Sequence, residues 1–599
     1  MNDKLRSTLH TAWEEPRHFF FWLTLLGLLG FVAIAVGMTV NTPNLLLTMA
    51  QARVLVTVLA FAALGCILGV VVGIPCFILA WIPPVRRGLA SLLWRRWLAL
   101  ACFVTLIALF YAVEDWRGRH AWLSFKRERE AKGERFDLTS LAPPAVPNDQ
   151  NFFETPLWQD LRFVETNGTT VLSDTNCSSR VIFSIYGPNG NNAPNPGSWL
   201  NARRVDLAAW QAFYRGSNNL FAVPGGPATN YFPIAQQSQS PAADVLLALS
   251  RFETNRQLLI AAAARPSARF WIKYDAGSGL LFAHLPRMKA CAQYLALHAN
   301  AALKAGDQAA ALEDLKALFR LVGALRQEPL LISQLVNIAV VHIGLQPVWE
   351  GLADRQWTEA NLKVIESELG HLDFLADYQH AMRGERACAI WAVDYYRQVG
   401  LSGLNELVAQ DDPSDSAAVE RVIGRMLVQL VPAGWSDQNK LSLCGTVERY
   451  LLPAVDLERE IISPTVAHQL QKEMDHLTMS LYDMLSRRLM PALASSANKF
   501  ARAQTAVDFA RIACALERYR LANGQFPDTL QALTPKFIAK LPHDVINGQP
   551  LNYHRTDDGQ FVLYSVGANE TDDGGKVELT KSGSIDMTKG DWVWRYPAR

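Results

Sequence analysis

The chain has 599 residues, of which 50% are hydrophobic and 19% charged, and its formal net charge is +1. A soluble domain usually carries about 25% charged residues, so part of this chain is unusually apolar. The near-neutral balance excludes the strongly basic surface with which proteins bind nucleic acid, and we predict no nucleic-acid partner.

Three apolar runs without a charged residue lie near the start of the chain, at residues 19–40, 54–82 and 97–113. About 20 apolar residues in a helix span the hydrocarbon core of a bilayer. Three such runs in succession, with arginine pairs and aromatic residues at their ends, predict that residues 1–115 are a transmembrane region. Their partner is then the lipid bilayer.

Arginine pairs indicate the orientation of these helices. Arg86, Arg87, Arg95 and Arg96 lie between the second and third apolar runs. Because positively charged loops remain in the cytoplasm, three crossings place everything after Val113 on the opposite side of the membrane.

The segment after the membrane changes character twice. Residues 116–165 hold the alternating charges K-R-E-R-E-A-K-G-E-R, which favour an exposed juxtamembrane helix, and then a connector rich in Pro and Asn. Residues 166–240 alternate short β-type runs with Gly-, Asn- and Pro-rich loops, which predicts an irregular β-containing segment.

Residues 241–496 have apolar residues at helical spacing and predict a helical domain, either a compact bundle or an irregular α-solenoid. A polar loop is expected at residues 431–441. The eight cysteines include no C-x-x-C pair, and disulfides and buried thiols both remain open. The clearest helical segments are 288–304, 309–325, 330–352 and 359–369.

Residues 497–599 predict a small α/β module. A helix at 498–521 stops at Asn523-Gly524, and Asp558-Gly559 joins two β runs as a hairpin turn. The fold class is therefore mainly α, with transmembrane helices at the N-terminus and a small α+β module at the C-terminus.

Two resemblances follow from particular motifs. The stretch L-E-R-Y-R-L-A-N-G-Q-F-P-D-T-L-Q-A-L and the later F-V-L-Y-S-V-G-A-N-E-T-D-D-G-G resemble the soluble domain of major pseudopilins of type II secretion. This resemblance implies a long helix, a small antiparallel sheet and a calcium-binding loop. The segments W-R-G-R-H-A-W and R-Q-E-P-L-L-I-S-Q-L-V-N-I-A resemble a group of bacterial membrane-anchored proteins of unassigned function that carry the same C-terminal module.

The loop G-A-N-E-T-D-D-G-G concentrates oxygen ligands of the type that calcium prefers. We predict a calcium site formed by Asn569, Asp572, Asp573 and Asp591, and the pseudopilin resemblance implies the same ion. An ordinary solvated acidic turn is the alternative. We predict no other cofactor.

A second cluster of titratable residues, from His371 to Glu385, includes Asp377 and His380 and is followed by Arg386. A buried or interfacial ion-pair network is one interpretation of this cluster, and an acid/base site is the other. The chain has no G-x-G-x-x-G, P-loop, H-E-x-x-H or G-x-S-x-G motif, so we name no catalytic residue.

These observations predict a multi-pass protein of the bacterial inner membrane with a large periplasmic domain. We expect a non-enzymatic scaffold or interaction protein of the envelope, with envelope proteins as partners and a link to type II secretion-like machinery. The alternative function is an extracytoplasmic hydrolase with a site near His371–Glu385. The sequence gives neither the particular partner nor the oligomeric state.

Overall fold

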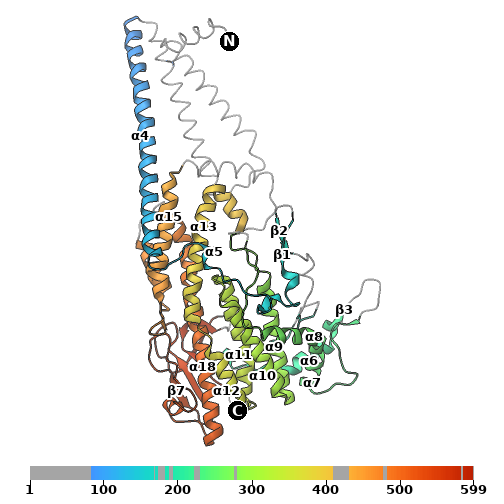
Figure 1. The fold of residues 1–599 in the computed structure, drawn as a ribbon. Helices are drawn as coiled ribbons and strands as arrows, with labels where there is room; N and C mark the ends of the chain where they lie inside the picture. The colour runs from blue at the N-terminus through green and yellow to red at the C-terminus, as the bar shows by residue number, and fades with distance from the viewer. Residues whose placement is uncertain are drawn as a thin grey trace. The chain divides into compact units, whose positions relative to one another are not determined.

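The computed structural model describes residues 74, 83–166, 169–172, 183–187, 193–221, 229–275, 280–408, 431–476, 482–581 and 585–597. The predicted spans 19–40 and 54–82, Ile74 excepted, lie outside the described residues. The chain divides into two units, Met1–Glu114 and Asp115–Arg599. The second unit is mainly helical, with a small antiparallel sheet region near its C-terminal end (Figure 1).

A single helix, α4 (Pro83–Glu130), covers 48 residues. The loop predicted before residue 97 is instead part of this helix, and the helices predicted at 97–113 and beside the membrane are one continuous helix. No proline follows Pro84 in this stretch, so nothing interrupts the backbone hydrogen bonds. The arginine pairs therefore lie on the helix itself.

The segment predicted as irregular and β-containing does hold short strands, β1 (Phe163–Thr166) paired antiparallel with β2 (Thr169–Leu172). It also holds a helix that the sequence analysis missed, α6 (Leu207–Arg215). The Asp206 carboxylate caps α6 by accepting a hydrogen bond from the Ala209 amide at 2.9 Å. The other short elements before residue 240 are α5 (Leu138–Leu141), η1 (Phe152–Glu154), η2 (Gln159–Leu161), η3 (Trp199–Asn201), η4 (Ser217–Asn219), β3 (Leu220–Phe221) and β4 (Thr229–Asn230).

Helices that pack side by side form the body of the second unit, and α9, α10 and α11 are consecutive neighbours (Figure 1). Their bounds agree with the helices predicted from apolar spacing. The described helices are α7 (Pro241–Leu249), α8 (Glu253–Ala263), α9 (His284–Ala305), α10 (Gln308–Leu325), α11 (Leu331–Ala353), α12 (Glu359–Gly370), α13 (Phe374–Val408), α15 (Ala433–Thr446), α16 (Val466–His476), α17 (Met484–Ala494) and α18 (Ala497–Asn523).

The predicted loop at residues 431–441 is instead the first half of α15. Pro432 lies at the helix N-cap, where a proline does not disturb the hydrogen bonds. Gly434 was mistaken for a loop residue. The absence of a side chain at Gly118 lets α4 approach it closely, since a Cβ on Gly118 would lie 2.1 Å from the Gly434 carbonyl oxygen.

By length and composition, α11 is long and apolar enough to cross a membrane. Most of its apolar window is buried within the second unit, as expected for a central core helix. Val341, Leu345 and Trp349 on this helix have no exposed surface.

The C-terminal region follows the predicted order. α18 ends at Gly524, whose positive φ of 83° suits glycine. A short 3-10 helix, η9 (Leu530–Leu533), precedes the hairpin of β7 (Asn552–Arg555) and β8 (Phe561–Ser565). β11 (Trp592–Trp594) pairs with the other edge of β8, and β9 (Val577–Leu579) pairs with β10 (Ile585–Gly590).

One continuous hydrophobic core joins the helical body to this C-terminal region. It includes Trp158, Trp349, Phe500 and Trp594. α18 is buried along most of its length because α11, α12 and α13 cover it as well as the sheet. The sequence boundary predicted at residue 497 therefore crosses a shared core.

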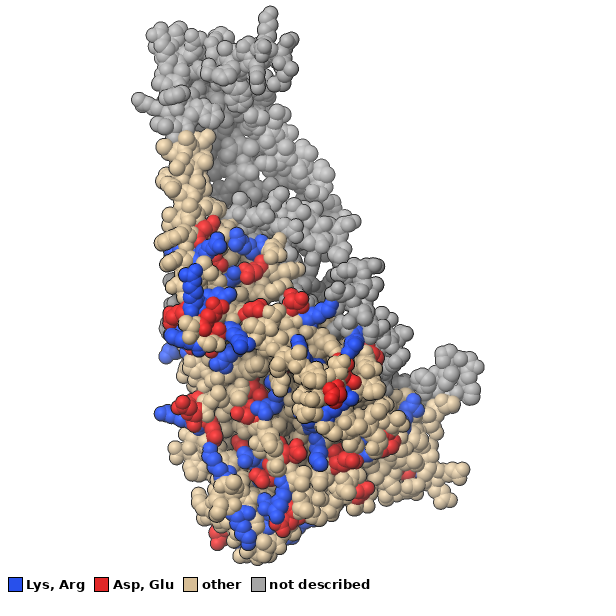
Figure 2. All heavy atoms as spheres, viewed as in Figure 1, with Lys and Arg blue, Asp and Glu red and all other residues tan. Residues whose placement is uncertain are grey.

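Two further features bear on function. Every cysteine in the described part of the chain is a free thiol, namely Cys102, Cys291, Cys388, Cys444 and Cys514. On the face shown in Figure 2, Lys and Arg side chains are intermixed with Asp and Glu, without a broad patch of one sign.

Candidate functional site

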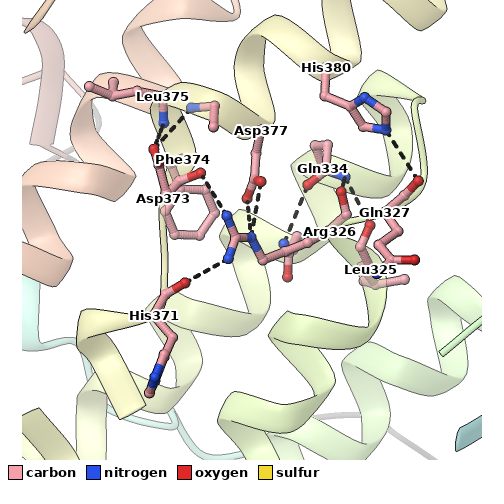
Figure 3. A network of polar contacts seen from close by, with 12 residues as sticks. Leu325, Arg326, Gln327, Gln334, His371, Asp373, Phe374, Leu375, Asp377 and His380 are labelled. Atoms are coloured by element: carbon pink, nitrogen blue, oxygen red, sulfur yellow. Dashed lines mark hydrogen bonds and ion pairs between the residues drawn. The ribbon is translucent and has the colours of Figure 1, made fainter. Parts of the chain in front are cut away.

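The predicted cluster between His371 and Glu385 lies where the N-terminal turn of α13 meets the corner between α10 and α11 (Figure 3). Arg326 Nε donates hydrogen bonds to both oxygens of Asp377, at 3.0 and 3.2 Å. Arg326 Nη1 donates to the backbone carbonyl of His371 at 2.6 Å. The arginine thus ties the corner to the start of α13.

Asp377 is only 4% exposed, and its burial opposes ionisation. Desolvation raises the pKa of Asp377 to about 7, although the charge and hydrogen bonds of Arg326 act in the opposite direction. This carboxyl group therefore titrates near neutral pH.

The neighbouring polar groups bind backbone atoms. Gln334 Nε2 donates to the carbonyl oxygens of Leu325 and Glu328, both at 2.9 Å, and so satisfies groups left open at the end of α10. His380 Nε2 lies 3.2 Å from the Gln327 carbonyl oxygen. The hydrogen bonds drawn in Figure 3 hold the helix corner together.

The titratable side chains of the cluster do not point toward one common position, as the groups of an acid/base site would. Figure 3 shows His380 pointing to Gln327 rather than to Asp377, and the His371 imidazole pointing away from Arg326. Glu385 accepts a hydrogen bond from the Leu331 amide at 2.9 Å. The arrangement agrees with the ion-pair interpretation of these residues. Its contacts stabilise the packing of α13 against the corner between α10 and α11.

A buried pair of titratable residues that the sequence did not predict, His284 and Glu328, lies beside this corner. His284 and Glu328 are almost fully buried, and His284 Nε2 lies 2.9 Å from Glu328 Oε1. Phe270 stacks on the His284 ring with a centroid distance of 3.9 Å. No sequence pattern relates the two residues, which come from different helix ends.

The predicted calcium ligands lie on one loop and on the strand edge beside it. The Asp591 carboxylate accepts hydrogen bonds from the Asp573 amide at 3.3 Å and the Gly575 amide at 2.6 Å. Asn569 Nδ2 donates to Asp573 Oδ2 at 2.9 Å, and Asp572 Oδ1 accepts from the Gly574 amide at 2.9 Å. The loop is thus closed by its own hydrogen bonds.

Asp591 is 2% exposed, and burial raises its pKa, with the charges of Asp572 and Asp573 adding to that effect. The four predicted ligands therefore share one small region. Within the described residues, however, no three His, Cys, Asp or Glu side chains are arranged to hold a metal ion. Calcium binding would require the oxygens of this loop to exchange their backbone partners for the ion, and the calcium site remains a prediction.

An open cleft of about 750 Å³ lies between α15, α17 and the last turns of α4. Its wall includes a π-helix, Val447–Leu451, directly after α15. π-helical turns are rare and are often found at functional sites. The side chains and glycine that define the cleft include Phe125, Arg129, Ser442, Gly445, Glu448 and Ser486.

Two charged side chains of the cleft wall, Arg129 and Glu448, belong to an ion network that extends to Arg386 and Glu134. Arg386 Nη2 lies 2.6 Å from Glu134 Oε2, and Arg386 Nη1 lies 3.2 Å from Glu448 Oε1. Arg129 Nε lies 2.7 Å from the other oxygen of Glu448. The network connects the end of α4 and the turn after it to α13 and the π-helix.

Comparisons with protein families, with curated proteins and with solved structures found no match to this chain.

Proposed function

We propose that this chain is a membrane-anchored, non-enzymatic scaffold or interaction protein of a bacterial envelope. In this proposal it is a multi-pass protein of the inner membrane, and its large unit lies in the periplasm. Envelope proteins are its partners, and the C-terminal module links it to type II secretion-like machinery.

The observation that carries the membrane anchor is the apolar surface of α4. Phe103, Leu106 and Leu109 are each more than half exposed, and no charged residue occurs from Leu100 to Val113. Exposed apolar side chains on a helix are unfavourable in water and suit lipid. This stretch coincides with the third predicted span.

The cleft supports an interaction role because its size is in the range of ligand-binding pockets and its wall combines apolar and charged side chains. Its charged members Arg129 and Glu448 are paired with one another. This pairing stabilises the wall, and the Arg129 guanidinium also lies over the Phe125 ring, with Cζ 5.4 Å from its centroid.

Support for the link to secretion comes from the order of elements at the C-terminus. A long helix, α18, ends in Asn523-Gly524 and is followed by the β7–β8 hairpin, as in the pseudopilin soluble domains that the sequence resembles. The proposed link depends on that resemblance.

The test is in vivo crosslinking followed by purification of the chain from native membranes. A Gly445→Trp variant fills the cleft, because a side chain at Gly445 meets no atom within 4 Å. Ala261→Trp, at an exposed site on α8, is the control. We expect envelope proteins, with secretion-machinery proteins among them, to crosslink to the wild type and to Ala261→Trp, and the partners that bind the cleft to be lost with Gly445→Trp.

Two outcomes contradict parts of the proposal. Capture of the same envelope partners by Gly445→Trp shows that the cleft is not the interaction surface. Absence of every envelope protein from the wild-type sample contradicts the scaffold role itself.

A further inference from the structure

Arg502, in the second turn of α18, is a buried cation without a counter-ion. Its residue is 5% exposed, and it makes no hydrogen bond or ion pair within the described structure. Burial lowers its pKa to about 10, so the guanidinium keeps its charge at neutral pH. An unpaired buried charge is strongly unfavourable, and arginine cannot relieve it by losing a proton.

The Arg502 side chain lines a small cavity between α18 and the C-terminal strands. The cavity has a volume of about 10 Å³, which is room for a single small occupant. Trp199, Thr505, Asp591 and Trp592 contribute to its lining.

The polar groups of this lining are mainly hydrogen-bond donors. The indole N–H groups of Trp199 and Trp592 are buried and have no acceptor among the described residues. The Thr505 hydroxyl donates its hydrogen bond to the Ala501 carbonyl at 2.9 Å, so it has no further proton to donate into the cavity.

Asp591 is the one carboxylate in this lining, and it is engaged elsewhere. Its oxygens accept the backbone N–H groups of Asp573 and Gly575 described above. It therefore leaves the positive charge of Arg502 unpaired.

The field of Arg502 extends to the neighbouring helix α11. Burial, together with the charge of Arg502, lowers the pKa of His342 to about 3. His342 is thus uncharged at neutral pH, and Arg502 is the one cation among the described residues that line the cavity.

We propose that this cavity binds a small monovalent anion of about the size of chloride, held by the guanidinium of Arg502. A single anion supplies the missing counter-charge and an acceptor for a donor-rich lining. A water molecule bridging Arg502 and Asp591 is the competing occupant. It would fill the same space without supplying a charge.

The test is the thermal unfolding of the purified full-length chain in detergent, in sodium chloride and in sodium gluconate at equal ionic strength. Gluconate is too large for the cavity and controls for general screening. An anion that binds only the folded state raises the melting temperature, by about 1–3 °C for a unit of this size. We expect this rise in chloride for the wild type.

Two variants make the result specific. Arg502→Gln removes the charge and should abolish the difference between chloride and gluconate. Lys499→Gln removes an exposed positive charge from the same helix and should leave the difference intact. Equal wild-type melting temperatures in the two salts, the result expected for a bridging water, overturn the proposal. A chloride effect of the same size in Arg502→Gln also overturns it.

Discussion

The guanidinium of Arg386 lies 2.6 Å from the carboxylate of Glu134, which is 252 residues earlier in the chain. Arg386 has no exposed side-chain surface, and its Cζ also lies 4.3 Å from the centre of the Phe136 ring. A second carboxylate, Glu448, completes the pairing. This one side chain joins the turn that follows α4 to the helical body.

Removal of Arg386 should destabilise the second unit strongly. We expect Arg386→Met to lower the free energy of unfolding by about 3–5 kcal/mol, because Glu134 and Glu448 lose a buried partner. Arg383→Met is the matched control, since Arg383 also contacts Glu134 but is about one third exposed, and its loss should cost at most about 1 kcal/mol. Denaturant unfolding of both variants measures the difference. Equal effects would show that Arg386 has no special role.

The close contact between Gly118 and Gly434 predicts that alanine at Gly118 and alanine at Gly445 will change stability in opposite directions. Gly118→Ala should destabilise the chain by about 1–3 kcal/mol, because the added Cβ meets the Gly434 backbone at 2.1 Å. Gly445→Ala places its Cβ in open space on α15 and should instead stabilise the helix by up to about 1 kcal/mol. Melting temperatures of the two variants should therefore shift in opposite directions. A shift in the same direction would contradict the close packing of α4 on α15.

The buried carboxyl group of Asp377 predicts a pH dependence. Its pKa is about 7 in the folded chain and about 3.9 when unfolded, so the unfolded state releases its proton first as pH rises. The stability that the protonated group contributes is complete below about pH 4 and is lost as pH rises through 7.

The Asp377→Asn variant has no titrating group at this position, so it is the reference against which the pH dependence of the wild type is measured. The stability advantage of the wild type over Asp377→Asn should shrink by roughly 1–3 kcal/mol between pH 5 and pH 8. Unfolding free energies of both proteins at the two pH values test this. An advantage that grows with pH would show that the ion pair with Arg326 outweighs burial.

The calcium prediction is tested on the full-length chain. If Asn569, Asp572, Asp573 and Asp591 hold the ion, millimolar calcium should raise the melting temperature relative to chelator, since binding favours the folded state. The double substitution Asp572→Ala and Asp573→Ala should remove the rise, while Asp557→Ala in the hairpin turn should retain it. Identical melting curves with and without calcium identify the loop as a solvated turn.

Local patterns in the sequence predicted much of the fold. α9 to α12 and α18 were predicted within a few residues because each has its own apolar spacing and a clear stop, such as Gly524. Asp558-Gly559 predicted the β7–β8 hairpin for the same reason: the signal is contained in the turn itself.

Features that depend on distant contacts were not predicted. Gly434 reads as a loop residue until Gly118 is placed against it. The ion-pair interpretation of the His371–Glu385 cluster was correct in kind, but the partners Arg326 and Glu134 come from remote parts of the chain. The sequence also does not predict that Arg502 is unpaired, because this depends on which residues surround it in the folded chain.

In the proposed topology, α4 crosses a membrane and places the second unit on its outer side. Reporter fusions after Leu138 test this most directly, with alkaline phosphatase, which is active in the periplasm, and a fluorescent protein, which folds in the cytoplasm. We expect active phosphatase and no fluorescence at this junction. Inactive phosphatase together with bright fluorescence would contradict the proposed topology.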